Sequence, residues 1–181
     1  GKWSHVCLSY TGTSYLFYVN GTLSATVSSS TAVYEPAWDC LRIGSVSNSW
    51  KGYVDSIRLS NTPTLLSYNP SLLANVINDY TTMFLATFEP TTTNFKEASV
   101  MPTSDGNQYQ YHIQSQSNAV VSSARGRFDN SSLYCTSSSG ALKLSTSTPS
   151  GAWTIDLWAA TSSMSSNVLI SGSQYMGIPT G

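Results

Sequence analysis

The acidic residues are too scattered for glycosidase chemistry, which needs two carboxylates on opposite sides of one glycosidic bond. The run from 153 to 159 carries a single carboxylate, Asp156, and Asp55 stands alone in the run from 52 to 59. Four further acidic residues fall in stretches with loop or linker character: Asp79, Glu89, Glu97 and Asp105. No stretch of the sequence therefore supplies the pair that such an enzyme requires.

Histidine and cysteine give little support to metal binding or nucleophilic catalysis. The two histidines, His5 and His112, are far apart, no cysteines form a Cys-x-x-Cys pair, and Gly-x-Ser-x-Gly and glycine-rich phosphate loops are absent. His5 lies in an apolar run, which favours a hydrogen-bonded structural histidine. The three cysteines cannot all pair; Cys7 is expected to be a buried free thiol, with a disulfide to Cys40 as the alternative.

Two tryptophans have the setting of a sugar-binding platform. The apolar C–H face of a sugar ring stacks on aromatic side chains, and Trp38 and Trp50 fall in stretches expected to be loops. We take them as candidate ligand-binding residues. Packing in the core is the competing explanation for both.

Short apolar runs separated by turn residues predict an all-β protein that carries these side chains on strands and loops. The strands are expected at 3–10, 15–19, 23–27, 40–44, 52–59, 83–88, 133–135, 141–144, 153–159 and 168–170, with a weak alternation at 109–113. Asn20-Gly21 is the strongest hairpin signal, since both residues accept the positive φ of a type I′ turn. Residues 61–80 read as a linker whose one candidate helix is 71–77, and residues 89–107 as a loop.

The composition excludes two classes of partner. Charged residues make up 9% of the 181 residues, and the formal net charge is −1, so no basic field attracts nucleic acid or an anionic lipid surface. No stretch approaches the roughly 20 apolar residues of a membrane-spanning helix. We therefore expect neither nucleic acid binding nor membrane insertion.

Four motifs follow one another in the first 60 residues: GKWSHV at 1–6, YLFYVNG at 15–21, LRIG at 41–44 and WKGYVDSIRLS at 50–60. Their order and spacing resemble the C-terminal half of the laminin G-like, or concanavalin A-like, jelly-roll family. That half shows W-x-H-V, an L-x-x-Y-V-N-G hairpin, L-R-I-G and a closing G-x-I-D-x-I-R-I strand. The resemblance implies an antiparallel β-sandwich.

Three later motifs are FLATFE at 84–89, ARGRFDNSSLY at 124–134 and WTIDLW at 153–158. They resemble the N-terminal half of the same family, which carries L-x-x-F, A-K-F-G-x-S-L-x-F and F-T-I-E-F-W in that order. The halves thus occur in reversed order, with the C-terminal half at 1–60, a linker at 61–80 and the N-terminal half at 81–181.

Three arrangements explain the reversed halves. The first is an excerpt that spans the end of one tandem repeat and the start of the next. The second is a single, circularly permuted sandwich. The third is strand exchange, in which each half completes the sandwich of a neighbouring chain and leaves sheet edges open for polymerisation. The expected partners are accordingly neighbouring repeats or like subunits.

The resemblance also implies candidate metal ligands and a further argument on catalysis. Several laminin G-like modules bind Ca²⁺ at the sandwich rim through hard oxygen ligands, and Asp39, Asn48 and Asp129 lie in expected loops. Ordinary turn residues are the alternative for all three. Catalytic relatives carry E-x-D-x-x-E on one strand, whereas the comparable strand here offers only Asp156.

The function that these observations favour is a non-catalytic structural and binding module. We expect it on a virion, in a tail, fibre or capsid surface, or in another extracellular assembly that contacts glycans. The linker supports this, because an irregular Tyr/Asn/Pro segment between a closing and an opening strand resembles tandem jelly-roll modules of phage proteins. A secreted or cell-surface adhesion module similar to a lectin is the first alternative, and a glycoside hydrolase-like enzyme the second.

Overall fold

The computed structural model describes twelve ranges of the chain: 1–28, 41–44, 51–62, 82–88, 96–97, 113–117, 119–128, 130–135, 141–144, 151–161, 168–171 and 175–177. All regular structure in these ranges is β-strand. The strands are β1 (Ser4–Tyr10), β2 (Ser14–Val19), β3 (Thr22–Ser28), β4 (Leu41–Gly44), β5 (Gly52–Ser60), β6 (Thr82–Thr87), β7 (Lys96–Glu97), β8 (Ile113–Ser117), β9 (Ala119–Ser122), β10 (Ser132–Cys135), β11 (Ala141–Leu144), β12 (Trp153–Thr161), β13 (Val168–Ser171) and β14 (Tyr175–Gly177).

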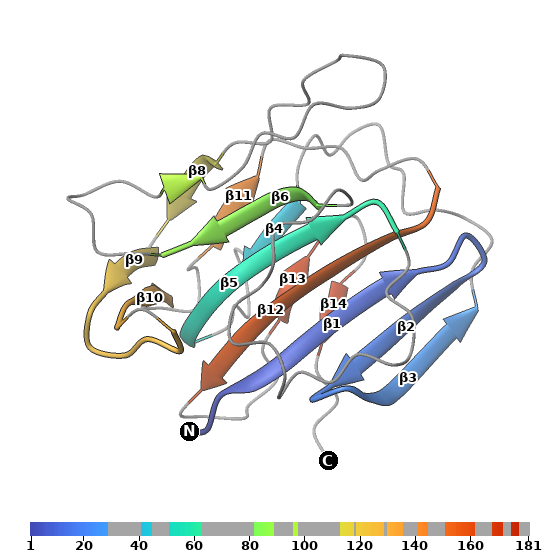
Figure 1. Ribbon diagram of the computed structural model, residues 1–181, viewed down its shortest axis with the longest axis horizontal. Helices are drawn as coiled ribbons and strands as arrows, with labels where there is room; N and C mark the ends of the chain where they lie inside the picture. The colour runs from blue at the N-terminus through green and yellow to red at the C-terminus, as the bar shows by residue number, and fades with distance from the viewer. Residues whose placement is uncertain are drawn as a thin grey trace.

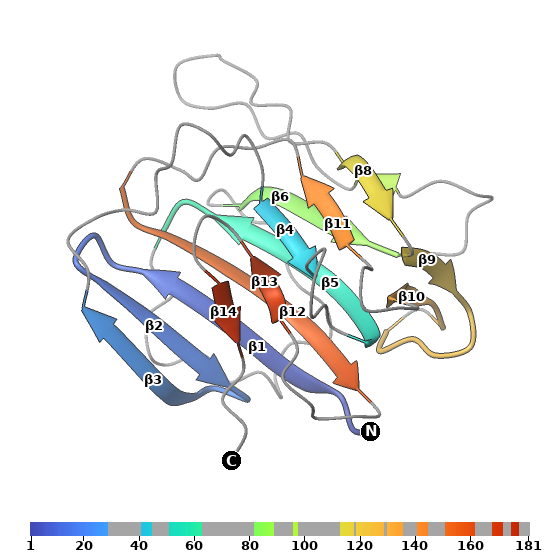
Figure 2. The same ribbon diagram turned by 180° about the vertical axis from the view of Figure 1, so that it is seen from behind.

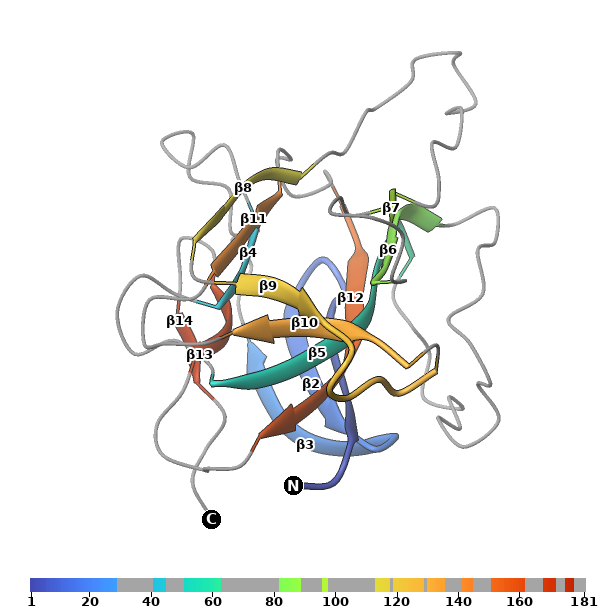
Figure 3. The same cartoon turned by 90° about the vertical axis from the view of Figure 1, so that its left-hand side faces the viewer.

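The strands form two antiparallel sheets. The larger sheet has nine strands in the order β3-β2-β1-β12-β5-β10-β9, with β6 also paired to β5 and β7 to β6. The smaller sheet has the order β14-β13-β4-β11-β8. Seen from the side, the smaller sheet forms a separate layer beside the larger one (Figure 3). The predicted fold class, an all-β antiparallel sandwich, is confirmed.

Both sheets combine strands from the two halves of the chain. In the larger sheet β12 lies between β1 and β5, where it pairs Ala159 with Ser4 on one side and with Val54 on the other (Figure 1). In the smaller sheet β4 lies between β13 and β11 (Figure 2). The motifs at 1–60 and those at 81–181 therefore contribute to the same two sheets.

The predicted Asn20-Gly21 hairpin is confirmed. Asn20 and Gly21 have φ of 50° and 78°, the left-handed region that a type I′ turn requires. The turn also returns to the first strand, because Asn20 N donates to His5 O and His5 N donates to Asn20 Oδ1, both at 2.9 Å. The end of β2 is thereby fastened to the start of β1.

Alternation along the central strands separates a hydrophobic face from a second face. Successive side chains of a strand point to opposite sides, so every second residue joins the same surface. The hydrophobic side chains of one surface are at most 3% exposed: Val6, Leu8, Ile57, Leu59, Leu133, Ile155 and Leu157. Each such burial stabilises the fold by about 1.5–3 kcal/mol before the entropy of ordering is subtracted.

A β-bulge in β5 changes which residues share a face. Asp156 pairs with Arg58 while Trp158 pairs with Asp55, so Ser56 and Ile57 together face a single residue of β12. Ser56 has a φ of 52°, which is uncommon for a residue other than glycine and fits the inserted position of a bulge. As a result Asp55 and Arg58, three residues apart, lie on the same face.

Most of the strands predicted from sequence are confirmed, with three omissions. β7, β9 and β14 lie where no strand is predicted, so the loop predicted over 89–107 is wrong at Lys96–Glu97. The weak alternation at 109–113 reaches only the first residue of β8. The candidate helix at 71–77 and all but the first two residues of the 61–80 linker fall outside the described ranges. Within those ranges no helix is long and apolar enough to cross a membrane.

Candidate functional site

The site residues predicted from sequence cannot be placed, because all five lie outside the described residues: Trp38, Trp50, Asp39, Asn48 and Asp129. Calcium binding at the last three stays a prediction. In the part of the chain that the structure describes, no group of three or more His, Cys, Asp and Glu side chains could hold a metal ion.

The second face of the larger sheet is polar and buried. It carries the side chains that alternate with the hydrophobic core on β1, β12 and β5, and we call it the polar face. Its members are at most 8% exposed: His5, Cys7, Ser9, Asp55, Arg58, Ser60, Thr154, Asp156 and Trp158. Because buried polar groups are costly without partners, their contacts decide what this face can do.

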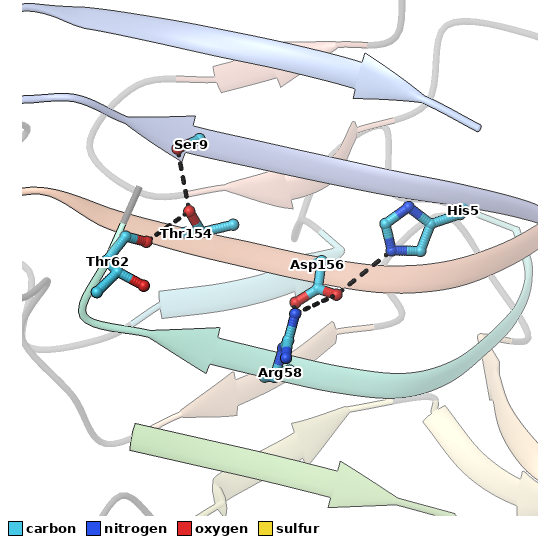
Figure 4. Close-up of polar contacts among 6 residues, drawn as sticks. All are labelled: His5, Ser9, Arg58, Thr62, Thr154 and Asp156. Atoms are coloured by element: carbon cyan, nitrogen blue, oxygen red, sulfur yellow. Dashed lines mark hydrogen bonds and ion pairs between the residues drawn. The ribbon is translucent and has the colours of Figure 1, made fainter. Parts of the chain in front are cut away.

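Asp156 is the centre of the polar face, with a cation on one side and an imidazole on the other. Arg58 Nε donates to Asp156 Oδ1 at 2.9 Å and Arg58 Nη2 to Oδ2 at 3.3 Å, while His5 Nε2 lies 3.3 Å from Oδ2 (Figure 4). Burial alone would raise the pKa of Asp156, but the His5 hydrogen bond and the Arg58 charge together lower it below its ordinary value. The three residues tie β1, β12 and β5 together, and the contact of His5 with Asp156 agrees with the hydrogen-bonded structural histidine predicted from sequence.

A nucleophilic role for the neighbouring thiol does not fit this environment. Cys7 lies two residues after His5 on the same face and carries a free thiol, as predicted, so the alternative disulfide to Cys40 is not formed. Burial and the negative charge of Asp156 raise the Cys7 pKa well above its ordinary value. A catalytic cysteine needs the reverse, a thiolate near neutral pH.

Hydroxyl groups continue the network along the same strands. Thr154 Oγ1 lies 3.0 Å from Ser9 Oγ on β1 and 2.8 Å from the backbone oxygen of Thr62, which follows β5 (Figure 4). This second cross-link also joins β12 to both neighbours. The centre of the polar face is thus committed to holding strands together.

A four-residue segment, Arg125–Phe128, is fastened to the polar face, and we call it the arginine strap. Arg127 N donates to Asp55 Oδ2 at 2.9 Å. Burial raises the pKa of Asp55 above its ordinary value, although backbone N–H groups of Arg127, Phe128 and Ser56 counteract part of that rise. The strap also needs Gly126, since a Cβ there would lie 2.3 Å from Ser131 N.

The strap places two arginines against aromatic rings. Arg127 Cζ lies 4.5 Å from the ring centroid of Trp158, and the Phe128 ring packs edge-on against the same indole at 5.9 Å. Arg125 Cζ lies 5.6 Å from the Trp3 ring and 5.9 Å from the Tyr53 ring. Contacts of this kind are cation–π interactions, worth about 0.5–1 kcal/mol each at exposed sites.

Arg125 belongs to a row of partly exposed side chains, Trp3, Arg125, Tyr53 and Tyr134, which we call the Arg125 row. Tyr53 and Tyr134 face each other across β5 and β10, and their rings stack at 4.7 Å with an angle of 23°. Arg125 Nη2 also donates to the backbone oxygen of Gly1. The register continues the row to Val120 on β9, which is 47% exposed.

The side chains of the Arg125 row are of the kinds that bind a ligand. It offers aromatic surface, phenol hydroxyls and guanidinium N–H groups, and none of the described carboxylates forms an ion pair with Arg125. One sequence feature points to this row: Arg-Gly-Arg at 125–127, in a chain with only eight Lys and Arg residues. No sequence feature indicates that residues 3, 53, 125 and 134 come together.

Comparison with known proteins covers the first third of the chain. Residues 1–65 match a laminin G family model that is described as the concanavalin A-like lectin/glucanases superfamily. No curated protein and no solved structure matches the chain. Over residues 1–65 the sequence is therefore similar to this laminin G family, which confirms the resemblance carried by its first four motifs.

Proposed function

We propose that this chain is a non-catalytic saccharide-binding module of a virion or another extracellular assembly, and that the Arg125 row is its binding site. The observation that carries the proposal is the row itself, a partly exposed set of aromatic rings, two of which contact the guanidinium of Arg125. Sugars bind proteins by stacking apolar C–H faces on rings while hydroxyls pair with polar groups. The match to a superfamily of lectins and glucanases supports the same ligand class.

The polar face supports the non-catalytic half of the proposal. Asp55 and Asp156 have pKa values displaced in opposite directions, the pattern that separates a general acid from its partner in a glycosidase. Both carboxylates, however, are at most 3% exposed, and Arg58, His5 and the strap N–H groups bond to their oxygens. A substrate would have to displace these contacts, so we assign both residues to stability.

We further propose that the reversed halves form one sandwich. The position of β12 between β1 and β5 supports this, because each edge of β12 is paired with a strand from the first 60 residues. The buried Arg58–Asp156 pair supports it again, since it joins residues 98 positions apart. The permuted arrangement is therefore our preferred explanation of the motif order.

The edge strand β3 supports the assembly half of the proposal. β3 is the last strand of its sheet, six of its seven residues are exposed, and Leu23 and Val27 are 46% and 59% exposed. It contains no charge and no proline, the usual devices that keep an edge from pairing, although one bulge at Ser24 interrupts its register. An edge of this kind favours contact with like subunits.

Binding measurements on row variants test the saccharide function. Oligosaccharides that bind in an array screen are titrated calorimetrically against the intact protein, Trp3→Ala and Tyr134→Ala. Loss of one ring contact costs about 1 kcal/mol, or roughly fivefold in affinity. Leu23→Ser on β3 is the control, because it removes an exposed apolar side chain at the opposite edge of the sheet. No binding, or binding that ignores both ring substitutions, contradicts the proposal.

The location of the protein is tested separately. Antibodies against the chain should label the outer surface of intact particles or of cells that produce it. If the chain is absent from both surfaces, its proposed role in an extracellular assembly is contradicted. The titrations still test saccharide binding independently.

A further inference from the structure

We infer that the Arg125 row selects saccharides that carry a carboxylate, as uronic and sialic acid units do, and that Arg125 is the residue that makes the selection. This inference rests on the proposed saccharide function and specifies its ligand class. Four features of the described residues carry it.

The first feature is that the guanidinium of Arg125 is held in place before any ligand arrives. It lies against the rings of Trp3 and Tyr53, and its Nη2 donates a hydrogen bond to the backbone oxygen of Gly1. The strap is fixed as well, because Ser132 Oγ donates to Arg125 O. A group that is already ordered loses less conformational entropy on binding, which favours affinity.

The second feature is that no carboxylate among the described residues compensates the charge of Arg125. The two carboxylates of the polar face are both engaged elsewhere: Asp156 by Arg58 and His5, and Asp55 by the backbone of the strap. Among the described residues no carboxylate lies within ion-pair distance of Arg125. Its positive charge is thus left for an external anion.

The third feature is that the ring contacts of Arg125 leave N–H donors over. Contacts with rings involve the flat faces of a guanidinium, whereas its N–H groups lie in its plane and form a fork that matches a planar carboxylate. The bond to Gly1 uses one nitrogen, Nη2. Among the described residues no hydrogen bond involves Nε or Nη1, and Arg125 is partly exposed, so both nitrogens remain for a ligand.

The fourth feature distinguishes a sugar acid from a simple anion. Tyr53 and Tyr134 stack beside the guanidinium and bring two phenol hydroxyls, and Val120 extends the row with an exposed apolar side chain. Hydroxyls and C–H faces occur together on a saccharide ring, which makes the surroundings of Arg125 more suitable for a sugar acid than for an isolated ion.

A matched ligand series tests the inference. The probes are an oligosaccharide ending in N-acetylneuraminic acid, its desialylated form and its methyl ester, which keeps the shape and removes the charge. We expect the acid to bind at least about tenfold more tightly than the ester, as the loss of one charge-assisted hydrogen bond implies. Arg125→Gln should abolish this ratio, whereas Arg125→Lys should retain part of it by charge alone.

Each outcome of the series has a defined reading. Arg127→Gln is the matched control, since Arg127 lies on the same strap but packs on Trp158, and it should leave the ratio unchanged. Equal binding of acid and ester, with Tyr134→Ala still weakening both, overturns the inference and leaves the saccharide function intact. The inference is also overturned if the ratio of acid to ester affinity disappears with Arg127→Gln but not with Arg125→Gln. Tight binding of a sulfated analogue alone would overturn it as well. Thermal melting of every variant checks that the fold is retained.

Discussion

Arg58 and Asp156 form a buried ion pair across two neighbouring strands, with Arg58 Nε 2.9 Å from Asp156 Oδ1. Arg58 lies in the first 60 residues, whose motifs resemble the C-terminal half of the family, and Asp156 lies in the part from 81 to 181, whose motifs resemble its N-terminal half. Asp156 is 1% exposed, so neither water nor salt replaces this contact. The pair therefore joins the two halves at the middle of the larger sheet.

Replacing Asp156 by Asn should destabilise the protein strongly. The substitution leaves the Arg58 guanidinium buried without its counter-charge, a change that costs roughly 3–5 kcal/mol. Equilibrium unfolding in urea measures the loss as a lower midpoint. The double variant Arg58→Met with Asp156→Leu removes both charges and should be more stable than Asp156→Asn alone, whereas equal or greater loss in the double variant would contradict the pairing.

The stability of the protein should fall on acidification because of Asp156. Its folded pKa lies below the ordinary 3.8, so its contribution is complete above that value and disappears as the pH falls through the folded pKa. Asp55 acts in the opposite direction: its raised folded pKa gives a contribution that is present below 3.8 and is lost as the pH rises through the folded value.

Two variants distinguish the contributions of Asp156 and Asp55 to the pH dependence of stability. In Asp156→Asn the free energy of unfolding should depend less steeply on pH below 4, while Asp55→Asn should remove the part of the decline that occurs above 4. Urea titrations from pH 2.5 to 6 measure both slopes. An unchanged acid dependence in Asp156→Asn would show that its carboxylate is not the group responsible.

Local sequence signals predicted most of the fold. Asn20-Gly21 specified its turn because positive φ is a property of these two residues themselves. β9 escaped prediction because it has only four residues, Ala-Val-Val-Ser, whose short apolar run does not alternate with polar residues. The bulge at Ser56 was not predicted for a different reason. Pairing with β12 imposes it, and serine itself has no preference for a positive φ.

The candidate site was far less accessible from sequence. The environment of His5 in an apolar run predicted a structural histidine, but its partner Asp156 lies 151 residues away. Trp3 read as part of a strand, and only the fold brings Arg125 onto its ring. Contacts between distant segments depend on strand order and register, which a single sequence with reversed motif halves does not specify.

The described cysteines should resist alkylation in the native protein. Burial raises the pKa of Cys135 from 9.0 to about 11, which alone lowers its thiolate fraction about 100-fold, and the Cys7 pKa is raised as well. Iodoacetamide labelling at pH 8, read by peptide mass spectrometry, should modify Cys7 and Cys135 only after urea is added. Rapid labelling of either one without urea would contradict their burial.

A charge on the edge strand should reduce self-association. Val27 is 59% exposed on β3, and lysine at such an edge opposes pairing with another strand. Sedimentation velocity over a range of concentrations should show a smaller oligomeric fraction for Val27→Lys than for the unaltered protein. Val27→Thr, which keeps the strand propensity, is the control; a lysine variant that associates equally well would remove β3 from the assembly proposal.

The most direct test of the binding site uses the indole N–H signals of the five tryptophans in a ¹⁵N-labelled sample. On addition of a bound oligosaccharide, the account predicts that the Trp3 signal shifts in proportion to saturation. The signals of Trp153 and Trp158, which are 4% and 5% exposed, should stay in place. A shift confined to Trp38 or Trp50 would place the ligand at the residues predicted from sequence and contradict the Arg125 row.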